Sequence, residues 1–88
     1  MKADLLMAQF VRERDEAVKT SIWTNDLRVF RRFYARQKAK GIYQIGLPSD
    51  EVLWVSLYKM LYHTKDATEE EKAMAERWLI AHGSSTKI

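Results

Sequence analysis

The sequence predicts an all-α protein, a small domain of four helices around one core. The 88 residues are 47% hydrophobic, which is too apolar for a disordered chain. They include only three Gly and one Pro, and helix start and stop signals divide them into four stretches with helical spacing of apolar residues. The length allows one domain, residues 1–88, and its end at 84–88 is expected to fray.

The small size and the composition limit how this chain can be stabilised. A chain of this length buries only about 60–65% of its unfolded surface. Because it has no cysteine, disulfides and thiolate metal sites are excluded. Stability must therefore come from helix packing, from self-association, or from both.

Neither a targeting signal nor a membrane span is expected. The apolar stretch at 5–11 is broken by Gln9 and followed by the charged run 12–16, unlike a signal peptide. No apolar run approaches the roughly 20 residues that a membrane span needs. We therefore expect a soluble protein of the reducing cytoplasm with no membrane partner.

The first helix is expected over residues 4–22. At about 100° per residue, its apolar side chains share one arc; these are Leu6, Met7, Phe10, Val11, Ala17 and Val18. Arg14 falls inside this arc, and two interpretations fit it. Either its stem packs while the guanidinium stays in water, or it forms a buried or interfacial ion pair.

The second helix is expected over residues 27–40. Thr24, Asn25 and Asp26 are all residues that cap helix starts, and Gly41 suits the position just after a helix end. The apolar arc of this helix is narrow, consisting of Leu27, Phe30, Phe33 and Tyr34, with Gln37 beside them.

An ordered, extended connector is expected at residues 41–49, where two of the Gly and the only Pro argue against helix. The apolar side chains of this segment are too many for a solvated loop; they are Ile42, Tyr43, Ile45 and Leu47. We expect it to lie across the core, with a short strand that pairs with a second copy as the alternative.

The third and fourth helices are expected over about 50–63 and 69–82. Ser49 should cap the third, with Asp50 and Glu51 in its positive first turn. Thr68 and Glu71 have the spacing of a capping box at the start of the fourth, which should stop at Gly83. The inner stripe of the fourth helix is predicted to be Met74, Ala75, Trp78, Leu79 and Ala81.

Catalysis, metals and cofactors find little support in this sequence. The only histidines, His63 and His82, end separate helices, where a cationic ring is stabilised by the helix dipole. They show no metal spacing, and there is no glycine-rich phosphate loop. We therefore expect a protein that is not an enzyme and that has no catalytic residue, no metal and no cofactor.

The charge is concentrated in one segment. No acidic residue lies between Asp26 and Asp50, whereas six basic residues do, namely Arg28, Arg31, Arg32, Arg36, Lys38 and Lys40. Four of these, Arg28, Arg32, Arg36 and Lys40, repeat every four residues and form what we call the basic ridge. Three uses remain open: a solvated face balanced by acids of the first and fourth helices, phosphates of a nucleic acid, or an acidic protein surface.

The third helix is apolar over an arc about twice the roughly 100° that a surface helix needs. Either it is the central helix, covered on both sides, or it presents an aromatic strip to a partner or to a second copy. The aromatic strip consists of Trp54, Tyr58 and Tyr62. Tyr and Trp are enriched at the anchor points of protein interfaces.

These patterns favour a small, non-enzymatic regulatory or inhibitory module that binds a protein through the aromatic strip, the cationic helix or both. The alternative is a nucleic-acid-binding accessory protein that places the basic ridge on phosphates. A homodimer through the third helix is also left open. In size and in its charged helix, the chain resembles small accessory proteins of phages and mobile elements.

Overall fold

The computed structural model describes residues 2–87, which form four α-helices and no β-strand. The helices are α1 (Lys2–Thr24), α2 (Arg28–Ala39), α3 (Asp50–His63) and α4 (Glu69–Ala81). The prediction of an all-α chain with four helices is therefore confirmed. None of the described helices is both long enough and apolar enough to cross a membrane.

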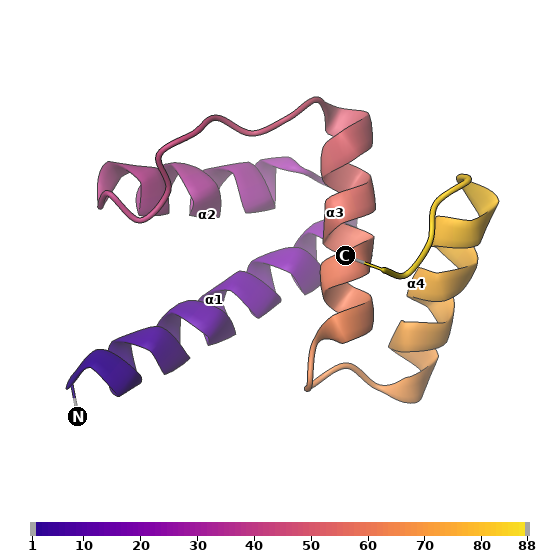
Figure 1. Ribbon diagram of the computed structural model, residues 1–88, viewed down its shortest axis with the longest axis horizontal. Helices are drawn as coiled ribbons and strands as arrows, with labels where there is room; N and C mark the ends of the chain where they lie inside the picture. Colours follow the sequence, from indigo (N-terminus) through magenta and orange to yellow (C-terminus); the bar gives the residue numbers. More distant parts are fainter. Residues whose placement is uncertain (1, 88) are drawn as a thin grey trace. The chain divides into compact units, whose positions relative to one another are not determined.

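The helices pair along the chain into two compact units, one ending at Gly46 and the other beginning at Leu47. In the first unit α1 packs against α2, and in the second α3 packs against α4 (Figure 1). Each unit is thus an αα-hairpin. The single core with the third helix at its centre stays a prediction.

The turn between α1 and α2 is built by Asn25 and Asp26. Asn25 is left-handed, with φ 52°, and its N–H donates to the Ile22 carbonyl at 3.2 Å. The Asp26 N–H reaches the Ser21 carbonyl at 2.9 Å, which completes the bonding pattern that closes many helices. The N-cap position of α2 is Leu27, one residue after the predicted capping group, and Asp26 Oδ1 accepts the Arg28 N–H at 2.9 Å. Asparagine tolerates this left-handed geometry better than most residues.

The glycines predicted to end helices do so. Gly41 has φ 81°, its N–H donates to the Lys38 carbonyl at 3.0 Å, and the Ile42 N–H donates to Gln37 at 2.9 Å. Gly83 has φ 72° and closes α4 with equivalent bonds to Ile80 and Leu79. A residue with a side chain would be strained at either position.

The starts of α3 and α4 differ although their sequences look alike. Thr68 forms the predicted capping box: its hydroxyl accepts the Glu71 N–H at 3.1 Å, and the Glu71 carboxylate accepts the Thr68 N–H at 2.9 Å. Ser49 occupies the predicted N-cap position, just before α3, but its side chain makes no capping hydrogen bond. The Ser49 carbonyl still accepts the Leu53 N–H at 2.9 Å.

This difference predicts unequal effects of two matched substitutions. Thr68→Ala removes a made capping bond and should lower the free energy of unfolding by about 0.5–2 kcal/mol. Ser49→Ala removes none and should cost clearly less. Urea denaturation followed by circular dichroism measures both changes. If both substitutions lowered the free energy of unfolding equally, the finding that Thr68 makes a capping hydrogen bond and Ser49 does not would be contradicted.

The core of the first unit is aromatic. Phe30 and Phe33 are buried, with ring centroids 5.7 Å apart, and Phe10 of α1 lies 5.8 Å from Phe33. The buried set also includes Ala17, Val18, Ile22, Leu27 and Gln37. The connector joins this cluster through Tyr43, whose ring stacks on Tyr34 at 4.2 Å.

Several side chains of the first unit depart from the expected burial. Leu6 and Met7 of the predicted apolar arc are 66% and 64% exposed. Ile42 and Ile45 of the connector are also exposed, so only part of that segment is covered. Arg14 forms a partly buried ion pair with Asp15 at 3.2 Å, which favours the second of its two interpretations.

The second unit is held by a leucine stripe. Leu53, Leu57 and Leu61 of α3 are buried, as are Ala75 and Leu79 of α4. Ala81, which was predicted on the inner stripe, is exposed.

The segment after α4, which was expected to fray, is hydrogen-bonded to the end of α3. Thr86 is half-buried, and its carbonyl accepts a hydrogen bond from His63 Nε2 at 2.6 Å. The end of α3 therefore holds the chain at Thr86. The last residue of the predicted frayed tail, Ile88, lies outside the described residues.

Candidate functional site

An open groove of about 540 Å³ lies on the second unit. It is lined by Glu51, Val52, Trp54 and Val55 of α3 and by Trp78 and His82 at the end of α4. We call it the aromatic groove. Its wall is mainly apolar, and Val52 remains 52% exposed beside it. A concave, mostly apolar surface with a few polar groups is the usual form of a binding site.

Trp78 and His82, on one side of this groove, belong to a stack of three rings. Trp78 lies parallel to Tyr58 at 4.1 Å and parallel to His82 at 3.8 Å. His82 is fixed in turn, because its Nδ1 lies 2.8 Å from the Trp78 carbonyl and donates to it. Two ring partners hold Trp78 in place, so that side of the groove is preformed and needs little ordering on binding.

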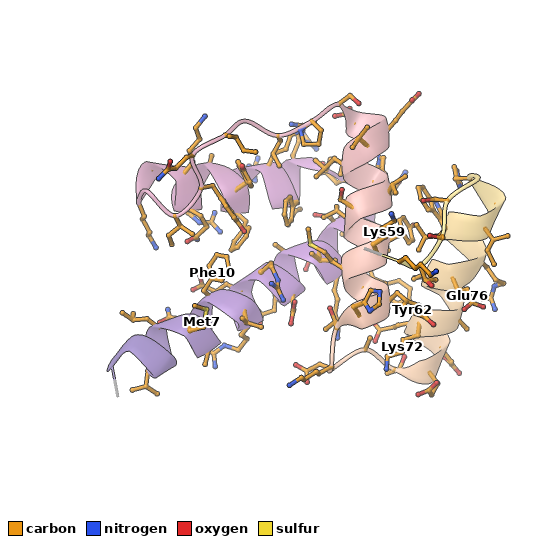
Figure 2. All side chains as sticks on the ribbon, viewed as in Figure 1. Met7, Phe10, Lys59, Tyr62, Lys72 and Glu76 are labelled. Atoms are coloured by element: carbon orange, nitrogen blue, oxygen red, sulfur yellow. The ribbon has the colours of Figure 1, made fainter. Side chains whose placement is uncertain are left out.

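The aromatic strip predicted from the sequence is divided between different environments. Trp54 lines the aromatic groove, whereas Tyr58 stacks on Trp78 and Tyr62 meets His63 edge-on at 5.1 Å. Desolvation raises the pKa of Tyr58, so this phenol stays neutral well into alkaline solution. Figure 2 labels Tyr62 on α3 and Lys72 on α4. The interface role of all three residues stays a prediction.

Sequence reasoning did not place Trp78 and His82 in this site. Trp78 was expected on the inner stripe of α4, and His82 only at its end. Their spacing of four residues was a usable signal, because residues i and i+4 share a helix face. What the pattern could not show was that this face meets Tyr58 of the preceding helix.

Part of the basic ridge of α2 is already close to acidic side chains of its own unit. Arg28 forms a two-pronged ion pair with Asp26, whose closest N–O distance is 2.9 Å. The hydrogen bonds from Arg28 hold the pKa of the Asp26 carboxyl below its usual range. Arg32 and Arg36 line a second groove, of about 400 Å³, together with Glu13 and Glu16 of α1. Part of the ridge therefore lies near acids of its own unit, as the solvated-face interpretation expected.

The remaining cations of the segment stand at the end of α2. Lys38 and Lys40 are exposed, and the described residues show no ion pair for either of them or for Arg36. Arg31 is half-buried. Of the predicted six, Arg36, Lys38 and Lys40 are thus the exposed cations nearest the end of α2, and Arg36 also lines the groove that contains Glu13 and Glu16.

The described residues contain no group of three or more His, Cys, Asp or Glu that could hold a metal ion. His63 and His82 each hydrogen-bond a backbone carbonyl and lie at the ends of different helices. One ring nitrogen of each histidine thus holds nearby backbone.

Comparison with known proteins adds no candidate. No protein-family model matches this chain, and no curated protein or solved structure was found to be similar to it.

Proposed function

We propose that the chain is a small, non-enzymatic cytoplasmic module that binds a protein partner through the aromatic groove. The observation that carries this proposal is the groove itself, with Trp54 and Val52 beside a ring stack that is already assembled. Trp and Tyr are the residues enriched where binding energy concentrates in protein interfaces.

The groove also indicates the kind of side chain it would receive. Its apolar lining suits an aliphatic or aromatic anchor, and Glu51 supplies a carboxylate beside it. Residues 47–88 carry five basic and seven acidic groups, a net charge of −2. An apolar anchor flanked by a basic residue would therefore be complementary to this surface.

The test is co-purification of the tagged chain from its native cells after nuclease treatment. The wild type should retain a protein that Val52→Glu loses, because the charge would be buried against the anchor. Val52 is half-exposed, so this change should leave the fold intact, and circular dichroism checks that. Trp23→Ala is the matched control, because Trp23 is 63% exposed and lies outside the groove. Equal retention by Val52→Glu and wild type would contradict the proposal.

A second candidate function is nucleic-acid binding by the end of α2. It is favoured by one observation, the exposure of Arg36, Lys38 and Lys40 with no ion pair among the described residues. Three such cations could contact phosphates and release counterions.

This candidate predicts a specific salt dependence. If the three cations contact phosphates, replacing Arg36, Lys38 and Lys40 by Gln should reduce the slope of log K against log salt by about three. Fluorescence anisotropy with mixed-sequence duplex and single strands measures the slope. Arg28→Gln is the control, because Arg28 is already paired with Asp26. Absence of binding by the wild type at low salt would eliminate this candidate.

A further inference from the structure

The first unit carries an apolar surface that its own helices do not cover. With 23 residues, α1 is about 34 Å long, whereas α2, with 12, is about 18 Å long. Phe10 contacts Phe33 and Tyr43, whereas residues 5–9, which precede it in α1, are exposed. Leu5, Leu6 and Met7 are 71%, 66% and 64% exposed there, and we call them the apolar overhang.

The apolar overhang is continuous with the core of the unit. Met7 and Phe10 are three residues apart and project from the same side of α1 (Figure 2). The connector adds Ile42 and Ile45, which flank Tyr43 in sequence and are 51% and 75% exposed. Tyr43 is held between Phe10 and Tyr34, so the connector is fixed beside the α1 stripe.

Cations stand beside this apolar surface. Lys38 and Lys40 lie four and two residues before Ile42, at a tight turn in which the Gly41 and Ile42 N–H groups donate to the Lys38 and Gln37 carbonyls. The first 46 residues carry ten basic and five acidic groups, a net charge of +5. The surface is therefore an apolar strip with a basic margin.

We propose that the apolar overhang, with the connector and its flanking lysines, binds an acidic amphipathic helix of a protein partner. Leu6, Met7 and Phe10 form a stripe with helical spacing, which is the kind of surface on which another helix lays its apolar face. α1 and α2 diverge from their turn (Figure 1), so a third helix can extend the hairpin into a three-helix arrangement. Acidic residues at the flanks of that helix would meet Lys38 and Lys40.

Two other occupants fit this surface less well. A second copy would bring another unit of net charge +5 to the same face, and like charges oppose that pairing. A nucleic acid would gain little from the exposed Leu, Met and Ile side chains, because bases stack on aromatic rings. The rings of Tyr34 and Tyr43 stack on each other, which occupies one face of each.

The binding test uses a synthetic amphipathic helix of about 18 residues, with Leu on one face and Glu on the flanks. A second peptide with Lys in place of Glu is the control ligand. The Glu peptide should bind, and Leu6→Gln/Met7→Gln should weaken its binding at least about tenfold, because two apolar side chains that the bound peptide would bury are lost. Ile80→Gln is the matched control, since Ile80 is 65% exposed and lies in the other unit.

Oxidation of Met7 supplies an independent readout. In the free protein, hydrogen peroxide should oxidise Met7 faster than the half-buried Met60, and the Glu peptide should protect Met7. Slow oxidation of Met7 in the free protein would mean that the apolar overhang is already covered, which would overturn the proposal. Three further results would overturn the proposal. They are equal binding of the Lys and Glu peptides, unchanged binding of the Glu peptide by Leu6→Gln/Met7→Gln, and displacement of the Glu peptide by an oligonucleotide. If the wild type self-associates and Leu6→Gln/Met7→Gln abolishes this, the apolar overhang would be assigned to a second copy instead.

Discussion

Replacing Leu57 by Ala is expected to lower the free energy of unfolding by about 2–5 kcal/mol. Leu57 is 0% exposed at the middle of α3, between Leu53 and Leu61 on the same stripe. Truncation removes its transfer free energy and leaves a cavity that the surrounding side chains fill only in part. A domain of this size has little stability to lose, so the effect should be easily measured.

Urea denaturation of the Leu57→Ala protein, followed by circular dichroism, measures this change. Ile80→Ala is the control because Ile80 is 65% exposed, and a surface change of this kind usually costs less than about 0.5 kcal/mol. If Leu57→Ala behaved like the control, α3 would not be the main source of stability in its unit.

Local signals in the sequence predicted the helices well because each depends on a few neighbouring residues. Gly41 and Gly83 adopt the positive φ that only glycine takes up readily, and both end helices. The Thr68 capping box needs one residue three positions away, and it forms as expected. Ser49 shows the limit of this reasoning, because a capping residue at the right position need not direct its hydroxyl to the helix.

The functional surfaces were less predictable because they depend on contacts between helices. The wide apolar arc of α3 indicated an excess of apolar surface, and Trp54 does line the aromatic groove. The stack of Trp78 between Tyr58 and His82 requires the packing of α3 against α4, which periodicity does not specify. Similarly, the pairing of Arg28 with Asp26 depends on the geometry of one turn.

Burial at the two ends of α1 shows a second limit. A hydrophobic arc indicates which face of a helix packs against the core, but it does not indicate how far along the helix that packing extends. Val18 is 0% exposed, whereas Leu6, on the same predicted arc, is 66% exposed. The difference arises because α2 is about half as long as α1. The apolar overhang could thus be located only from the structure.

Replacing Phe33 by Ala should destabilise the first unit by about 3–5 kcal/mol. Phe33 is 1% exposed and contacts both Phe10 and Phe30, so its removal opens a cavity at the centre of the aromatic cluster. The connector should loosen as well, because Phe10 also contacts Tyr43. Ala35→Ser, at an exposed position of the same helix, is the control.

Phe33→Ala and Leu57→Ala together test the predicted single core. Hydrogen exchange measured on peptides from residues 2–46 and 47–87 reports each unit separately. If the units unfold as one cooperative domain, each substitution should speed exchange of the most protected amides in both segments. If they unfold independently, Phe33→Ala should act only on the first and Leu57→Ala only on the second. The second result would replace the prediction of one core by two small cores, one in each unit.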